Sequence, residues 1–415
     1  MENSITLSSI YTLAECSSIW IGGILKKFMH LKIIIIIGGC LYILASLGIM
    51  LLDTFLWYKL MMVLFGLGQG VQEIISYANA CAFIPEKKGL INGLSKISWT
   101  LSSSLFNYMG LHIVNPEGKE VELYIDNGLS KNIIKYTIII IICFSFVTAG
   151  STILLIPYRK EAYEKINIEK ENTNDLKKEN KEENYDEDNN KMIESEKEIK
   201  IDDDEISFFT FLKCIRFYTC LFMYSFKNIH SNLVISSFSL FAIHYNTVSM
   251  DTRKYIASAS FIVNFIAITL LSFIVDKYKY RSIVIPSNLL NLCHALTFQF
   301  IIKNKILYII YYFMSGIFNS IEIVATFPHL LKVFGHKNIV IILGVFCIGT
   351  GFCNYGMNSF VDYILSKYDK TQVNEYDRVV KNLFYMTSSF TFISIILMTF
   401  ENENSVLTSI FKKTK

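Results

Sequence analysis

Long apolar segments recur along almost the whole chain, and they constrain its fold more than any other feature. A helix that crosses the hydrocarbon core of a bilayer needs roughly 20 mostly apolar residues. Runs such as Ile33–Ile37 and Thr137–Ile142 belong to such segments, and few soluble folds could bury so many long apolar helices. The pattern predicts a polytopic all-α membrane protein with about eleven spanning helices, at residues 5–25, 33–52, 57–83, 91–113, 133–156, 209–245, 254–275, 282–302, 305–331, 338–363 and 380–400.

Charged residues are concentrated between the fifth and sixth of these segments. Residues 158–206 hold 18 acidic and 10 basic side chains, with too few apolar ones to offset the entropy lost on ordering. We therefore expect a disordered linker at 158–207. It would separate an N-terminal transmembrane bundle of about five helices at 1–157 from a six-helix C-terminal bundle at 208–401, followed by a tail at 402–415. The positive-inside rule does not decide the orientation, and other basic residues only slightly favour a cytoplasmic linker and tail.

An internal repeat occurs at an offset near 250 residues. The turn Gly22–Lys27 ends one apolar run, and Ser272–Lys277 ends another. Glu73 and Glu322 are separated by nearly the same interval. A repeat of this length predicts two pseudo-symmetric six-helix halves, with one helix missing from the first half. The missing helix is expected to be the first, because the basic turn follows the first helix of one half but the second helix of the other.

Several function classes find no support in the sequence. No C-x-x-C, H-E-x-x-H, G-x-S-x-G or P-loop motif occurs, so we expect no metal, no cofactor, no enzymatic activity and no ATP-driven pumping. All nine cysteines fall within apolar runs, where small buried hydrophobes are expected. The lysines form no continuous face, which argues against nucleic-acid binding. The N-terminus lacks the basic region of a signal peptide.

Several motifs resemble those of one transporter family, and their members follow the family's order. They are Gly66–Gly70, Tyr77–Asn79, Phe83–Leu90, Gly93 and Asn115–Pro116 in the first half, and Phe327–Pro328, Phe334–Asn338 and Gly344 in the second. They are similar to the monocarboxylate and oxalate:formate antiporter branch of the major facilitator superfamily. The turns at 22–32 and 272–281 resemble the signature that this superfamily repeats in its two halves. The resemblance covers most of the chain.

The glycines of these motifs also have a direct physical reading. Gly66 and Gly70 share one helix face, and Gly89 and Gly93 share another. Small residues at such spacing let neighbouring helices approach closely in a membrane, where no hydrophobic effect drives the helices together. We therefore expect these four positions to lie at tight helix–helix contacts.

The resemblance implies the major facilitator fold and transport by alternating access, with a site near the bilayer midplane between the two repeats. It also implies that two basic turns anchor helix ends and hold a gate between the halves. The first turn departs from the family pattern, because Lys26 stands where the family usually has Asp. Asp276 keeps that Asp, whereas Ser272 and Lys279 replace glycines. The gating residues implied in this way are Gly22, Lys26, Lys27, Asp276, Lys277 and Arg281.

Ionisable side chains inside predicted spans are costly in lipid, so each one is a candidate for function. Glu73 and Glu322 lie in helices that line the superfamily's cavity, and they are candidates for proton coupling or gating, or for structural ion pairs. Lys227 and His230 are candidate cations for an anionic substrate, or a polar face at the headgroups. His294 is expected to be buried and structural. Asparagines that either bind substrate or join helices are Asn79, Asn107, Asn319, Asn354 and Asn358.

The resemblance also bears on the substrate. The stretches 255–275 and 339–361 contain no Lys or Arg, although related oxalate carriers place cationic side chains there. This departure argues against oxalate and small dicarboxylates. Monocarboxylate carriers of the branch often use a lysine of the first family helix, which is the helix expected to be missing.

The sequence therefore predicts a secondary active transporter of a small organic solute. The expected solute is a monocarboxylate-type anion, carried in symport with H⁺ or in exchange for a counter-anion. The alternative is a non-transporting membrane sensor or scaffold built on a carrier fold. The expected partners are the solute and membrane lipid, in either the plasma membrane or an organellar membrane.

Overall fold

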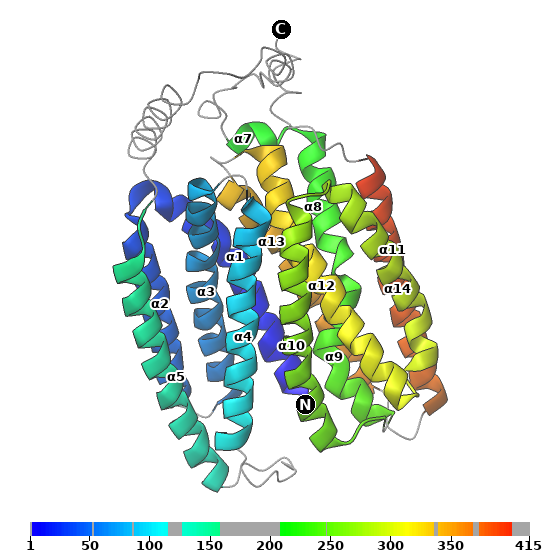
Figure 1. Ribbon diagram of the computed structural model, residues 1–415. Coiled ribbons are helices and arrows are strands. Elements are labelled where there is room, and N and C mark those ends of the chain that lie inside the picture. Colours follow the sequence, from blue (N-terminus) through cyan, green and yellow to red (C-terminus); the bar gives the residue numbers. More distant parts are fainter. Residues whose placement is uncertain are drawn as a thin grey trace, which may run out of the picture. The chain divides into compact units, whose positions relative to one another are not determined.

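A computed structural model describes residues 2–51, 54–84, 87–114, 127–157, 208–245, 247–335, 339–367 and 373–400, and it is helical almost throughout these ranges (Figure 1). No strand occurs among the described residues. The predicted linker and tail lie outside them, as do the motif residues at 115–116 and 336–338 and the side chain of Asn107.

The first half of the chain forms five long helices. Their bounds lie within a few residues of the predicted spans, except that α5 begins six residues early. They are α1 (Glu2–Phe28), α2 (Leu31–Ile49), α3 (Phe55–Phe83), α4 (Lys88–Val114) and α5 (Asn127–Leu154).

The second half follows the predicted spans in the same way, with two exceptions. The last helix begins at Val373, seven residues before the predicted span at 380–400. The segment predicted as a single helix at 209–245 is broken at Cys214 and again at Asn228. The helices of this half are α7 (Phe208–Phe211), α8 (Ile215–Lys227), α9 (Ile229–His244), α10 (Met250–Val275), α11 (Tyr280–Ile301), α12 (Lys305–Phe334), α13 (Ile339–Lys367) and α14 (Val373–Phe400).

If α8 and α9 are taken as two parts of one span, the described residues form eleven long helical segments. Seven helices are apolar and long enough to cross a membrane by length and composition. The remaining segments, α1, α4, α8–α9 and α11, are broken or carry polar side chains such as Glu15, Lys96, Lys227 and His294. The chain is thus an all-α integral membrane protein whose least apolar helices carry buried polar groups.

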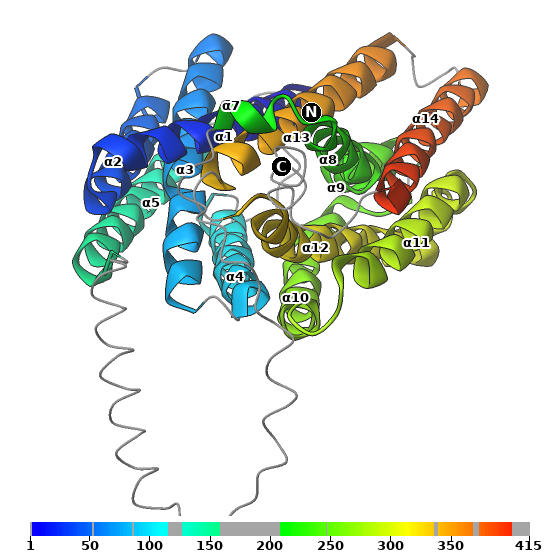
Figure 2. The ribbon, with the colours of Figure 1, turned by 90° about the horizontal axis from the view of Figure 1, so that it is seen from above.

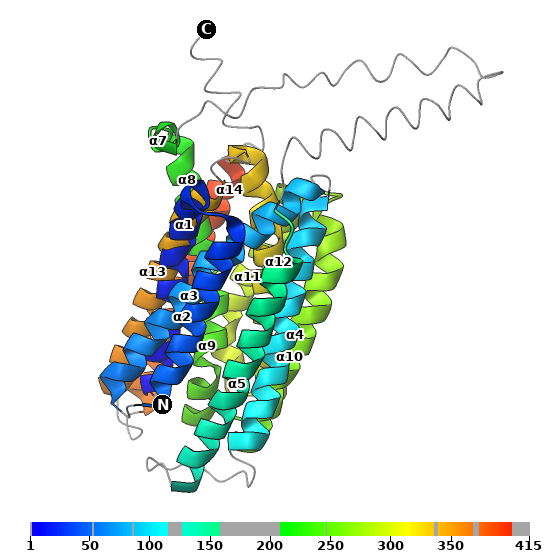
Figure 3. The same cartoon turned by 90° about the vertical axis from the view of Figure 1, so that its left-hand side faces the viewer.

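Two helix pairs make most of the contact between the two halves. The first is α1 with α13, and the second is α4 with α10, which lie side by side both from above (Figure 2) and from the side (Figure 3). These two contacts are equivalent if α1 of the first half corresponds to α10 of the second, and α4 of the first half corresponds to α13 of the second. The remaining helices fit the same correspondence. The packing of α1 on α3 matches that of α10 on α12, and the packing of α2 on α5 matches that of α11 on α14. The halves are therefore pseudo-symmetric.

The broken segment α8–α9 packs against α12, α13 and α14. By the pseudo-symmetry, its counterpart would pack against α3, α4 and α5, but no described helix of the first half occupies that place. Burial shows the same asymmetry. Only 6% of the spanning window of α5 is buried, compared with 44% for the window of its counterpart α14.

The motif glycines lie at close helix–helix contacts, as their spacing predicts. A Cβ atom at Gly66 or Gly70 would meet backbone atoms of α1, next to Tyr11 and Glu15. A Cβ atom at Gly93 would meet Ser272 of α10. These small residues therefore bring α1 onto α3 and α4 onto α10.

Candidate functional site

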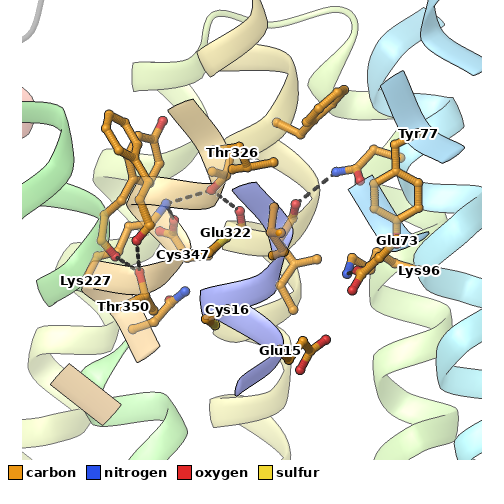
Figure 4. A pocket seen from close by; sticks show the side chains of 18 residues that line it. Glu15, Cys16, Glu73, Tyr77, Lys96, Lys227, Glu322, Thr326, Cys347 and Thr350 are labelled. Carbon is orange, nitrogen blue, oxygen red and sulfur yellow. Dashed lines mark hydrogen bonds and ion pairs between the residues drawn. The ribbon is translucent and has the colours of Figure 1, made fainter. Parts of the chain in front are cut away.

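A cavity of about 220 Å³ lies between the two halves (Figure 4). It is lined by α1, α3 and α4 from the first half and by α8, α12 and α13 from the second. Its volume is that of about seven water molecules, at roughly 30 Å³ each. Five ionisable side chains reach it at membrane depth, and they are Glu15, Glu73, Lys96, Lys227 and Glu322.

The second half contributes a buried ion pair between Lys227 of α8 and Glu322 of α12, and each side chain is only 2% exposed. The Lys227 ammonium group also donates a hydrogen bond to the Thr326 hydroxyl at 2.9 Å and another to the Tyr280 hydroxyl at 3.3 Å. It lies 4.0 Å from the ring centroid of Tyr224, where a cation–π contact adds stabilisation. Lys227 is thus held by one charge and several polar groups.

The first half contributes a second ion pair, between Glu73 of α3 and Lys96 of α4. The Glu73 carboxylate also accepts a hydrogen bond from the Tyr77 hydroxyl at 2.9 Å and one from the Gln69 amide at 3.2 Å. Glu15 of α1 lines the same cavity and interacts with Glu73. The cavity therefore contains three carboxyl groups and two ammonium groups.

The break between α8 and α9 lies at the cavity. Asn228 interrupts the helix there and lines the cavity beside Lys227. Its side-chain oxygen is buried and has no hydrogen-bond partner within the described structure. Asn291 of α11 donates a hydrogen bond, at 3.5 Å, to the Lys227 carbonyl next to the break. Discontinuous helices of this kind form substrate sites in many transporters, because the break leaves polar groups available at membrane depth.

Three of the seven predicted substrate or coupling residues line the cavity. They are Glu73, Glu322 and Lys227. The predicted candidates that do not line it are His230, Asn79, Asn319 and Asn354.

His230 belongs to a buried polar cluster of the second half. Its Nε2 atom lies 2.8 Å from Nδ1 of His294, and its Nδ1 atom lies 3.2 Å from the Thr387 hydroxyl. His294 in turn bonds the Tyr311 carbonyl at 2.9 Å. On an unbroken helix, His230 would share a face with Lys227, because residues three apart are neighbours. The break at Asn228 separates them.

Asn358 joins helices, which is one of the two roles expected of the asparagines. It donates to the Ser9 hydroxyl of α1 at 3.0 Å and accepts from the Ser236 hydroxyl of α9 at 3.0 Å. It therefore connects the two halves as well as two helices of the second half.

The predicted gating turns lie at the upper face in Figure 1, where α1 and α10 end. Asp276 accepts hydrogen bonds from the backbone N–H groups of Gly89 at 2.7 Å and Leu90 at 3.0 Å. These groups belong to the N-terminus of α4, so the carboxylate also faces the positive end of that helix dipole. Arg281 donates to the Thr399 carbonyl at 3.2 Å, and Gly22 packs against Val71.

The remaining gating residues lie close to these contacts. Lys26 and Lys27 are in the last turn of α1, and Lys277 follows α10. The structure thus shows a contact between the two halves at the second gating turn, where Asp276 keeps the aspartate of the family pattern.

Besides neutral lining residues, sequence reasoning missed two charged residues of the cavity, Glu15 and Lys96, and Asn228 at the helix break. The signal for the first two was present, because each is an ionisable residue inside a predicted span, and such a residue is costly in lipid. Asn228 gave no comparable signal, since no Pro or Gly marks the break.

Comparison with known proteins supports the fold but gives no match by sequence. No protein-family model matches this chain, and no curated protein matches it. Solved structures do match. The major facilitator proton:xylose symporter XylE, bound to 6-bromo-6-deoxy-D-glucose, is 10% identical with a TM-score of 0.65, and the match covers 98% of this chain and 88% of that chain. The fucose:proton symporter FucP of E. coli is 11% identical with a TM-score of 0.60, covering 96% of this chain and 90% of that chain.

A double tryptophan variant of XylE also matches, at 10% identity with a TM-score of 0.63. Likeness at this level of identity shows the fold alone. Together with the internal pseudo-symmetry and the helix order, it shows that the chain has the major facilitator fold.

Proposed function

We propose that this chain, which has the major facilitator fold, is a secondary active transporter that moves a small organic solute by alternating access. The observation that carries the proposal is the buried Lys227–Glu322 pair, which lies in the cavity between the halves and beside a helix break. A buried pair is costly to maintain for stability alone, because desolvation of two charges can exceed their attraction. Its position in a cavity therefore favours a role in binding and coupling.

The charge balance of the cavity ties anion binding to proton uptake. Three carboxyl groups face two ammonium groups, so the cavity has a net charge of −1 when all five are ionised. An anionic solute would be repelled by this charge. One proton on a carboxyl group makes the cavity neutral, and a second makes it cationic. Symport of an anion with H⁺ follows from this balance.

Glu322 is the carboxyl group that we assign to coupling. When it accepts a proton, its attraction for Lys227 falls, and the ammonium group becomes free to bind a carboxylate of the solute. The unpartnered oxygen of Asn228 lies beside Lys227 and can accept a hydrogen bond from a hydroxyl of that solute. The halves then rock about the α1–α13 and α4–α10 contacts, and release of the solute lets the pair re-form.

A monocarboxylate-type anion fits these features. Lys227 provides one cation to bind one carboxylate, and the cavity of about 220 Å³ suits a solute of few carbon atoms. Neutral sugars are the second candidate, because XylE and FucP are by their titles sugar:proton symporters. Once two of its carboxyl groups are protonated the cavity is cationic, and in that state it favours the carboxylate over the neutral sugar.

The test uses the purified protein in liposomes, with an imposed pH gradient and a panel of labelled monocarboxylates and sugars. We expect an inward proton gradient to drive accumulation of a monocarboxylate. Glu322→Gln should lower that accumulation by about tenfold or more, since it removes the proton acceptor and one charge–charge contact. Asp377→Asn is the matched control, because Asp377 forms the exposed pair with Lys303 outside the cavity.

The outcomes separate the alternatives. Accumulation of a sugar but no monocarboxylate would replace the proposed substrate class. If correctly folded protein moves no member of the panel, the transporter proposal is wrong and the sensor or scaffold alternative is favoured.

A further inference from the structure

A second cavity of about 230 Å³ lies at the upper face in Figure 1, outside the central site. It is formed by the start of α4, the turn between α10 and α11, and the last turns of α12. Three lysines line it, namely Lys88, Lys279 and Lys332, and the acidic residue among its lining groups is Asp276. We call this space the mouth cavity.

The charge of the mouth cavity is positive. Its carboxylate, on Asp276, is already bonded to the backbone N–H groups of Gly89 and Leu90 at the start of α4. Three ammonium groups against one carboxylate leave a net charge of +2. A concave surface of one sign raises the local concentration of ions of the opposite sign.

A buried polar group in the wall of this cavity has no partner. The side chain of His329 is 4% exposed, and its Nε2 atom is buried without a hydrogen-bond partner in the described part of the chain. The same residue lines the mouth cavity. Leaving a buried polar atom unpaired costs free energy, so this atom needs a partner, which an ion or a water molecule in the cavity can provide. In the tautomer with its hydrogen on Nε2, His329 is a donor for an anion.

The mouth cavity is connected to the central site through one side chain. Tyr280 lines the mouth cavity, and its hydroxyl accepts the hydrogen bond from Lys227 of the central ion pair. The Tyr280 ring stacks on His329, with centroids 4.0 Å apart and an angle of 20° between the planes. The Tyr224 ring of the central site lies 6.3 Å from Tyr280 and 6.4 Å from His329. These three rings separate the two cavities.

We infer that the mouth cavity is a second anion-binding site, which holds the transported carboxylate before it enters or after it leaves the central site. Lys279 and Lys332 attract the carboxylate, and His329 donates a hydrogen bond to it. Displacement of the Tyr280–His329 stack then opens the way to Lys227. The identity of the anion as the transported solute rests on the proposed function, whereas the anion site itself does not.

The first experiment tests anion binding in the mouth cavity and does not depend on transport. Purified protein is treated with a water-soluble amine-reactive reagent in sodium acetate, sodium phosphate or sodium chloride of equal ionic strength. Modification of each lysine is then measured by mass spectrometry. Acetate should protect Lys279 and Lys332, and it should leave Lys87 unprotected, because Lys87 is exposed nearby but does not line the cavity. His329→Ala should reduce the protection.

The second experiment measures uptake. The double variant Lys279→Ala, Lys332→Ala should raise KM for the monocarboxylate about three- to tenfold, as expected when contacts to a charged group are lost at a partly exposed site. Its maximal rate should change less than its KM. Lys87→Ala should leave both unchanged.

The two experiments distinguish the possible failures. Equal modification of the three lysines in acetate and chloride overturns the anion site. Protection by inorganic phosphate but not by acetate overturns its role as an entrance for a carboxylate. If the protection is present but wild-type protein takes up no solute, the proposed function fails while the anion site stands.

Discussion

Removing the Lys227–Glu322 pair one charge at a time should cost more stability than removing both charges together. Each side chain is 2% exposed, so water screens neither charge. Lys227→Met leaves a buried carboxylate without its cation, and Glu322→Gln leaves a buried ammonium group without its anion. Breaking a buried pair from one side costs about 3–5 kcal/mol, whereas replacing both partners is often close to neutral.

We therefore expect a coupling free energy of at least about 3 kcal/mol in the double-mutant cycle, above the range usual for residues in contact. The pair formed by Lys303 and Asp377 is the internal control. Its nitrogen and oxygen atoms are 2.6 Å apart, but the side chains are 61% and 31% exposed. An exposed pair contributes about 0–1 kcal/mol, so its cycle should give a coupling below about 1 kcal/mol.

The assay measures unfolding of the purified protein in a single detergent. Unfolding is monitored as the loss of the folded fraction in size-exclusion chromatography. All variants are compared under identical conditions, because membrane-protein unfolding is often irreversible and its midpoint then depends on the conditions. The reasoning is refuted if the effects of Lys227→Met and Glu322→Gln simply add in the double variant. It is also refuted if the exposed pair shows the larger coupling.

Three further predictions follow from the packing and the polar contacts. Gly70→Leu should abolish the folded yield in size-exclusion chromatography, because its side chain would meet the α1 backbone, while Gly150→Leu should have little effect, since that site faces open space. Asp276→Asn should speed hydrogen exchange at the first amides of α4 by about tenfold, and unchanged exchange would contradict a role in holding the halves together. His230→Ala should destabilise the fold by about 1–3 kcal/mol yet leave KM for the solute unchanged, and a raised KM would restore its predicted role in substrate binding.

The helices were largely predictable from the sequence because lipid places the same two requirements on every span. Each span needs enough apolar residues, and its whole backbone needs internal hydrogen bonds. The break at Asn228 was not predictable in this way, because its neighbours have ordinary helical residue types. It depends on tertiary partners such as Asn291, which bonds the Lys227 carbonyl from a different helix.

The cavity was predictable in part, for a related reason. The cost of a buried charge singled out Glu73, Glu322 and Lys227. The same argument applies to Glu15 and Lys96, which also lie inside predicted spans but were not among the predicted site residues. Which charges form pairs could not be derived, since that depends on how α1, α3 and α4 face one another.

The two buried ion pairs have a consequence for movement between the halves. Glu73 and Lys96 both belong to the first half, and Lys227 and Glu322 both belong to the second. Each half therefore neutralises these charges by itself, and sliding one half over the other leaves both pairs intact. Contacts that do cross the halves include the bonds from Asn92 to the carbonyls of Ile323 and Val324, at 2.9 Å and 3.1 Å.

Water can replace neutral bonds of this kind one at a time, at little net cost to each. An ion pair across the halves would instead have to be pulled apart in a medium of low dielectric constant. Keeping both ion pairs within single halves thus lowers the electrostatic cost of any sliding of one half over the other. Such a movement would have to exchange the hydrogen bonds that cross the halves, such as those from Asn92 of α4 to the α12 backbone and from Asn358 of α13 to Ser9 of α1.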